Sequence, residues 1–182
     1  MNKQSPVAME ITVKLLDTKP ATWRKLIVPI GIRYDQLHVL IQLSFGWQNA
    51  HLFSFKPKNK DIEYLNYIDD YGDFFNIKQV YADQGYLYQD LSDDTVLYTY
   101  DFGEDWEHLI TLKKLLTFED LDNAIIPSCI AGAGGSLGED GNAPDAATSR
   151  FNRKNINKNL SLWSKAGEQM ITGADMGLFP NM

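Results

Sequence analysis

Cysteine is almost missing from this chain of 182 residues. The single thiol, Cys129, leaves no partner for an internal disulfide, which fits a reducing compartment. No run approaches the ~20 apolar residues of a membrane span. The first residues, MNKQSPVAMEITVKLLD, alternate apolar and polar residues where a signal peptide has an unbroken apolar run. We therefore expect a cytoplasmic protein that has no membrane segment.

The common signatures of metal sites and phosphate-binding loops are also missing. The sequence contains none of the CxxC, HxxxH or HExxH spacings of common metal sites, and no GxxxxGK[ST] loop that would cradle a phosphate. A resolvase-type serine in an arginine-rich setting is not visible, because the four arginines are scattered along the chain. These absences favour a binding module over an enzyme.

Charge is distributed unevenly along the chain. The sequence has 17 Lys/Arg and 24 Asp/Glu, for a net charge of −7. Residues 1–60 hold nine basic and three acidic residues, whereas residues 61–110 hold one basic and thirteen acidic residues. A broad acidic middle repels phosphate backbones, so duplex DNA is a disfavoured partner. A local basic patch in the first third and a merely solvated acidic surface remain alternatives.

The N-terminal part of the sequence predicts three strands and a helix. MEITVKLL alternates apolar and polar residues, and WRKLIVP follows after a short turn, so the two segments predict a hairpin. Residues 35–45 carry apolar side chains at helical spacing, with Asp35 as the N-cap and Gly46 as the stop. Residues 51–56 alternate again and predict a third strand.

The segment YDFGEDWEH, residues 100–108, raises the main chemical question. Alternation over residues 96–102 and 106–116 predicts a hairpin whose aromatic inner face includes Phe102. Asp101 is a candidate general acid or base if burial raises its pKa. The favoured interpretation is that its carboxylate bonds to the turn amides around Gly103.

The remaining segments are less regular. Residues 56–94 predict one short strand, a loop and then a short helix within residues 77–91. The glycine-rich stretch 126–147 predicts a loop, and residues 150–167 predict a final helix. We expect a single α+β domain over residues 1–182, with a core of about 8–165 and a loosely packed tail, 166–182. Its sheet is expected to be mixed, mostly antiparallel and about five-stranded, with two or three helices packed on it.

Several of these pieces together resemble the plasmid pRiA4b ORF-3-like family of small α+β proteins. The matching residues are Trp23-Arg24, Leu37-His38, Phe45-Gly46-Trp47, His51, Tyr100-Asp101-Phe102-Gly103, Asp105, Trp106, His108, Pro127, Cys129 and Glu139-Asp140-Gly141. The combination of FGW with YDFGxDWEH is specific. The resemblance implies the fold and a plasmid or insertion-sequence setting, that is, a mobile genetic element, and implies no reaction.

Two departures from the family pattern bear on metal binding. Phe53 stands where the family commonly has a second histidine. The stretch SLGEDGN stands in place of a cysteine-rich loop and lacks both prolines and the second cysteine. If the loop and the histidines of the family hold a metal, this chain has lost part of the set.

Two groups of candidate residues follow. The candidate functional surface consists of Trp23, Arg24, His38, Trp47, Asp101, Asp105, Trp106, Glu139 and Asp140. The candidate metal ligands are His51, His108 and Cys129, for which zinc is a suitable metal that is not favoured here. The alternative is that both histidines are core or interface residues and that Cys129 is a small buried hydrophobe.

The expected function is a non-enzymatic binding or regulatory module that contacts protein. The absence of a complete catalytic constellation favours it, together with aromatic strands and a long glycine-rich loop suited to recognition. The alternative is a metal-dependent enzyme or a metal-stabilised nucleic-acid factor that uses His51, His108 and the hairpin acids Asp101 and Asp105.

Overall fold

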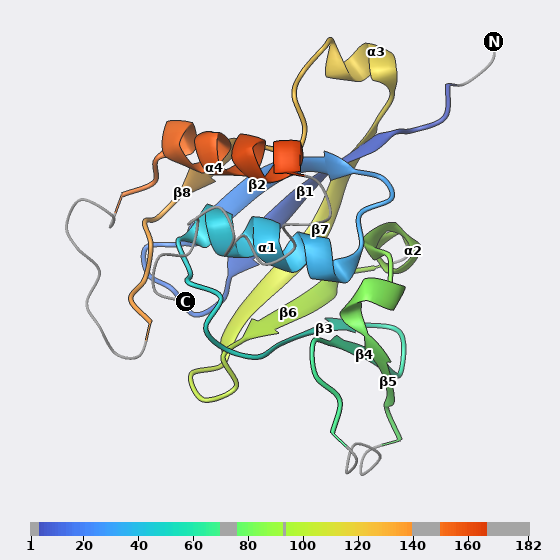
Figure 1. The fold of residues 1–182 in the computed structure, drawn as a ribbon, viewed down its shortest axis with the longest axis vertical. Helices are drawn as coiled ribbons and strands as arrows, with labels where there is room; N and C mark the ends of the chain where they lie inside the picture. The colour runs from blue at the N-terminus through green and yellow to red at the C-terminus, as the bar shows by residue number, and fades with distance from the viewer. Residues whose placement is uncertain (1–3, 70–75, 93, 140–149, 167–182) are drawn as a thin grey trace.

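The structure is a computed structural model that describes residues 4–69, 76–92, 94–139 and 150–166. Within them the chain forms one mixed sheet in the order β5-β4-β3-β6-β7-β1-β2-β8, accompanied by four α-helices (Figure 1). The predicted α+β class and mostly antiparallel sheet are confirmed, whereas the expected count of about five strands is too low. The predicted tail from residue 167 on and Asp140 lie outside the described residues.

The centre of the sheet consists of the strands that the sequence predicts. β1 (Ala8–Leu15) pairs antiparallel with β2 (Thr22–Pro29) on one side and with β7 (Trp106–Leu116) on the other. β6 (Val96–Tyr100) forms the predicted hairpin with β7, and β3 (Phe53–Pro57) pairs with β6. Successive side chains of a strand point to opposite faces, so the apolar alternation places one face of each strand in the core.

The additional strands lie at the two edges of the sheet. β4 (Ile62–Leu65) is the short strand expected within residues 56–94, and β5 (Lys78–Tyr81) joins it in parallel. β8 (Ser128–Ala133) pairs with β2 at the opposite edge, so the prediction of a loop there was wrong. Its residues are mostly small because the space is limited: a Cβ on Gly132 would meet the Phe151 ring. The strand therefore shows no alternating pattern in sequence.

Helix α1 (Tyr34–Phe45) lies across one face of the sheet and is buried along nearly its whole length (Figure 1). It ends at Gly46, whose φ of 76° lies in the left-handed region that favours glycine, as the predicted stop requires. The helix begins one residue earlier than predicted. Arg33 is the N-cap, so the assignment of Asp35 as N-cap was wrong, and Asp35 instead forms an ion pair with Arg33.

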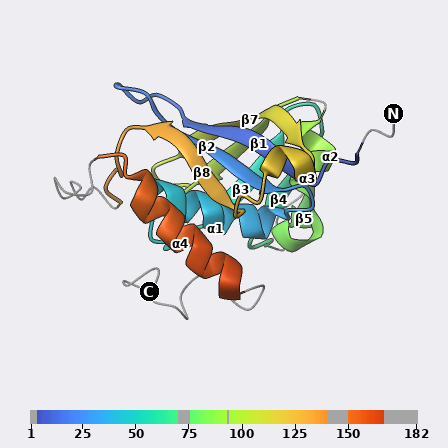
Figure 2. The same cartoon turned by 90° about the horizontal axis from the view of Figure 1, so that it is seen from above.

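Helix α4 (Arg153–Ala166) is the predicted final helix and covers the same face of the sheet as α1 (Figure 2). Its buried seam consists of Ile156, Leu160 and Trp163. The helix predicted within residues 77–91 is only partly right, because the 3₁₀ turn η1 (Ala82–Gln84) and the short helix α2 (Leu87–Leu91) follow β5 there. A further short helix, α3 (Phe118–Leu121), follows β7.

The turn between β6 and β7 differs from the prediction at one aromatic residue. Tyr98 and Tyr100 are buried, but Phe102 is 45% exposed, so its predicted place on the inner face was wrong. Asp101 has a φ of 59°, which ends the strand alternation just before Phe102. The Asp101 carboxylate accepts a hydrogen bond from the Gly103 amide at 3.0 Å, as the turn interpretation predicts.

Candidate binding cleft

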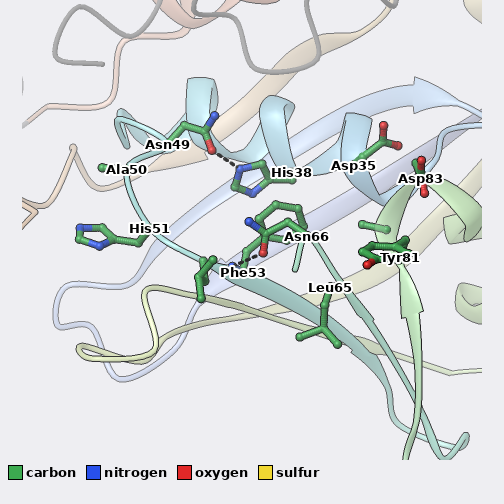
Figure 3. A pocket seen from close by; sticks show the side chains of 12 residues that line it. Asp35, His38, Asn49, Ala50, His51, Phe53, Leu65, Asn66, Tyr81 and Asp83 are labelled. Carbon is green, nitrogen blue, oxygen red and sulfur yellow. Dashed lines mark hydrogen bonds between the residues drawn. The ribbon is translucent and has the colours of Figure 1, made fainter. Parts of the chain in front are cut away.

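A cleft of about 600 Å³ opens beside the N-terminal half of α1, at the edge of the sheet that β3, β4 and β5 form (Figure 3). Its apolar lining includes Phe53, Leu65 and Ala82, which are all buried. Its polar lining residues are Asp35, His38, Asn49, His51, Asn66, Tyr81 and Asp83. The volume and the mixed lining are typical of sites for a small ligand or for a side chain of a partner.

His38 forms one wall of this cleft and is held in a single orientation. Its ring stacks on Phe53 with 3.6 Å between ring centroids. Because Asn49 Oδ1 can only accept, His38 Nε2 donates to it at 2.6 Å, and Nδ1 accepts from the Tyr98 hydroxyl at 2.9 Å. Gln42 donates to the same hydroxyl at 2.9 Å. Burial lowers the pKa of His38 to about 4, so the ring is neutral at pH 7.

The loop at residues 48–50 is fixed by three side chains, two of which come from distant parts of the chain. Its successive amides donate to Glu139 Oε1 at 2.7 Å, to Gln42 Oε1 at 2.8 Å and to the Tyr100 hydroxyl at 2.9 Å. A shift of this loop would leave buried polar groups unpaired, at a cost of about 1–3 kcal/mol for each group. The wall of the cleft that the loop forms is therefore preorganised.

Aromatic side chains support this loop from behind. Trp47 is 2% exposed and lies 5.1 Å from Trp106 and 5.7 Å from Tyr100 between ring centroids. The Tyr100 hydroxyl donates to Glu139 Oε1 at 3.0 Å. Glu139 Oε2 and the indole nitrogens of Trp47 and Trp106 are buried and have no hydrogen-bond partner in the part of the chain that the structure describes. We therefore assign these residues the role of positioning the cleft wall.

His51 lies at the end of the loop, between the cleft and the hairpin turn. Its Nε2 is 3.6 Å from Asp101 Oδ2, and its ring meets the Tyr100 ring edge-on at 5.8 Å. Asp101 is 8% exposed, and its other oxygen accepts a hydrogen bond from the Gly103 amide, so the carboxylate is held within ion-pair distance of the imidazole. Asp105, in the same turn, is exposed.

Other candidate residues do not line the cleft. Arg24 is 1% exposed and, with Trp23, belongs to β2. His108 is fully buried; its Nδ1 donates to the Trp106 carbonyl at 2.9 Å, and burial lowers its pKa to about 3. Cys129 is buried in β8, and burial raises the pKa of its thiol. Of the candidate surface, the structure gathers His38, Trp47, Asp101, Trp106 and Glu139 in and around the cleft.

Metal ligation was the alternative interpretation of the histidines. Among the described residues, no group of three or more His, Cys, Asp and Glu side chains is arranged to hold a metal ion. In that part of the chain, His51, His108 and Cys129 are thus not gathered into one ligand set.

A serine pattern lies in the segment after β8. Residues 134–138 have the sequence GGSLG, which matches the GxSxG pattern of serine hydrolases. In those enzymes the serine sits between a strand and a helix, whereas residues 134–139 are irregular and Ser136 lies against Gly46. The pattern here belongs to a segment that packs on the end of α1.

Several cleft residues were not singled out from the sequence. Asn66 and Asp83 lie in the acidic stretch 61–110 and belong to none of the motifs described above, so nothing in the sequence indicates that they share a site. Gln42, which holds the loop beside the cleft and does not line the cleft itself, was detectable, because it follows His38 by four positions and therefore lies next to it on the apolar face of a helix. Two polar side chains at that spacing on a buried face indicate a hydrogen-bonded pair or network.

The Tyr100 anchor can be tested directly. Tyr100→Phe removes the group that accepts from Ala50 N and donates to Glu139, and we expect it to lower the free energy of unfolding by about 1–3 kcal/mol. Amide hydrogen exchange at Ala50 should become faster. Tyr67→Phe, at a residue that is 62% exposed, is the control and should change neither quantity. Unchanged exchange at Ala50 would show that the loop is fixed by other contacts.

These features define a class: small α+β proteins with one mixed sheet, two helices on the same face and a polar cleft at the β3–β4–β5 edge. The family model of the plasmid pRiA4b ORF-3-like proteins matches residues 7–149. The chain belongs to this family, as the sequence motifs implied. None of the described helices is long and apolar enough to cross a membrane.

Two further proteins are similar to this chain. The uncharacterized protein y4hQ of Sinorhizobium fredii is 30% identical over 107 residues, which are 58% of this chain and 53% of that protein. The chain therefore spans about half the length of this curated relative. A crystal structure of a protein of unknown function, MM3350 from Methanosarcina mazei Go1, has a TM-score of 0.63 at 22% identity, covering 94% of this chain and 87% of the other. At this identity the likeness shows a shared fold.

Proposed function

We propose that this protein is a non-enzymatic binding module with a regulatory role, and that its cleft receives a segment of a protein partner. The observation that carries the proposal is the preorganised wall: three consecutive amides of residues 48–50 are each held by a buried side chain. A rigid wall lowers the ordering cost of binding, which is a property of recognition sites. The neutral His38 ring, with both nitrogens engaged, supports a fixed surface over a proton-transfer role.

The setting and the partner class are part of the same proposal. The family description points to plasmids, and we place the module in a plasmid or transposable-element context. Duplex DNA is an unfavourable partner for the cleft, because β4, β5, η1 and α2 all belong to the segment 61–110, with thirteen acidic residues and one basic residue. A protein segment has no such continuous negative charge.

A peptide library tests the proposal, because it samples many candidate partner segments at once. Random peptides of about twelve residues are displayed on phage and selected on the full chain. Ala50→Trp places a large ring at an exposed residue that lines the cleft, and Ala21→Trp makes the same change at an exposed residue of the β1–β2 turn. Selected peptides should lose binding to Ala50→Trp and keep it with Ala21→Trp. Peptides that bind both variants equally, or no enriched peptides at all, would contradict the proposal.

A further inference from the structure

The cleft carries two carboxylates, only one of which is already engaged. Asp35 forms a double contact with Arg33, from Nε to Oδ1 at 3.0 Å and from Nη2 to Oδ2 at 3.2 Å. Asp83, in η1, is exposed and makes no ion pair or hydrogen bond within the described residues. Asp83 is therefore the carboxylate that is available to a ligand.

An exposed aromatic ring stands two residues before this carboxylate. Tyr81 ends β5, lines the cleft and is 47% exposed. In Figure 3, Tyr81 and Asp83 are drawn at one end of the cleft and His51 at the other. A ring face beside a carboxylate suits a cationic group, because the ring attracts the cation through its quadrupole and the carboxylate through its charge.

The floor of the cleft is suited to the hydrocarbon part of a long side chain. Phe53, Leu65 and Ala82 are 5%, 7% and 3% exposed and line the cleft. The methylene groups of arginine or lysine can lie along such a surface while the charged end reaches a polar group. A short acidic side chain would meet the same floor and the repulsion of Asp83.

We propose that the cleft recognises an arginine side chain of the partner segment, with the guanidinium on Asp83 and against the Tyr81 ring. This inference rests on the binding function proposed above. Arginine fits better than lysine because its planar fork binds both carboxylate oxygens and stacks on an aromatic face. The thirteen acidic residues of segment 61–110 add attraction for a cation and repulsion for an anion.

Four blocked tripeptides test the inference on the full chain: acetyl-Ala-X-Ala-amide, with X as Arg, Lys, Leu or Glu. Each is titrated into ¹⁵N-labelled protein, and the amide resonances of residues 50–53, 66 and 81–83 are followed by NMR. The arginine peptide should bind most tightly, about tenfold or more over leucine and glutamate, because hydrogen bonds to a charged group are stronger than those between neutral groups. Lysine should fall between them.

Matched variants identify the residues responsible. Asp83→Asn should weaken the arginine peptide about tenfold, to the level of the leucine peptide. Asp61→Asn removes the same charge at an exposed residue just before β4 that does not line the cleft, and should leave the affinity within about twofold. Tyr81→Leu should weaken the arginine peptide about threefold and leave the leucine peptide unchanged. Circular dichroism at the titration temperature verifies that each variant is folded.

Failure of this inference is distinguishable from failure of the proposed function. If the leucine or glutamate peptide shifts the cleft amides as strongly as arginine, or if Asp83→Asn binds arginine like the unaltered protein, the arginine assignment is overturned and the binding module stands. If no tripeptide shifts these amides and the phage peptides ignore Ala50→Trp, both are overturned.

Discussion

Between pH 6 and pH 5, the free energy of unfolding of this protein should fall by about 2–2.5 kcal/mol. Two buried histidines produce this effect. Burial lowers the pKa of His38 to about 4 and that of His108 to about 3. For His38 the bond to Asn49 and the nearby Asp35 act in the opposite direction, and for His108 the nearby Arg24 adds to the lowering.

The direction of this pH dependence follows from which state binds protons. In the unfolded chain both histidines take up protons near their ordinary pKa of about 6.5. In the folded chain they stay neutral until the pH falls to about 4 for His38 and about 3 for His108. The unfolded state therefore gains protons first as the pH falls. The contribution of His38 and His108 to the free energy of unfolding is complete above pH 6.5 and is lost as the pH falls from 6.5 to about 3.

Urea denaturation at half-unit pH steps measures this slope. His108→Gln should reduce the slope to about half, because one titrating group is removed. Leu40→Ala is the control: it empties core volume without removing a titratable group, so it should lower stability at every pH and keep the slope. A slope that His108→Gln leaves unchanged would mean that His108 is not buried in its neutral form.

Replacing Arg24 with methionine should cost about 3 kcal/mol or more of unfolding free energy. Arg24 is 1% exposed and donates to three backbone carbonyls: Ser44 at 2.7 Å, Trp23 at 2.9 Å and Ala133 at 2.7 Å. Methionine keeps the apolar stem and leaves those carbonyls without this donor. Desolvation lowers the pKa of the guanidinium only to about 10, so it remains charged at pH 7.

The loss of stability in the Arg24→Met variant should be concentrated where β2, α1 and β8 contact one another. The guanidinium carbon lies 4.7 Å from the Phe45 ring and 5.0 Å from the Phe151 ring, so Arg24 also holds the chain just before α4. Urea denaturation gives the total cost, and amide exchange in β8 and α4 shows where it falls. Lys25→Met is the neighbouring control, at a surface ion pair with Glu10, and should cost less than about 1 kcal/mol. Equal costs at the two positions would contradict the assigned role of Arg24.

The fold was predictable wherever a segment's own pattern determines its structure. Apolar and polar residues alternate in strands β1, β2, β6 and β7, and apolar residues recur at helical spacing in α1 and α4. In each of these elements the pattern identifies the buried face. β8 does not, because its small residues fit a crowded edge and its pairing is supplied by β2. β5 also shows no recognisable strand pattern, since a four-residue parallel edge strand buries little of its own surface. These strands depend on neighbours that are remote in sequence.

The same distinction applies to the candidate residues: the sequence identifies motif residues, whereas their contacts depend on segments that are remote in the chain. Trp47, Tyr100 and Glu139 were recognisable in the sequence as residues of the family motifs. Their common role, which is to support the loop at 48–50, depends on contacts between segments that are far apart in the chain and is visible only in the structure. Arg24 was placed on a surface, and the structure places it in the core, where backbone carbonyls take the role of a counter-ion. A sequence contains the donors and cannot show which carbonyls they will meet.

The anchoring of the loop at residues 48–50 also determines when the cleft can exist. Its anchors belong to α1, β6 and the segment after β8, so a partly folded chain that lacks any one of them has no complete cleft. A ligand of the cleft consequently binds the native state alone, and at a hundred times its Kd it adds about 2.7 kcal/mol to the free energy of unfolding. The melting temperature of the whole protein thus becomes a reporter of cleft occupancy, by which fractions of a cell extract can be ranked for the presence of a partner.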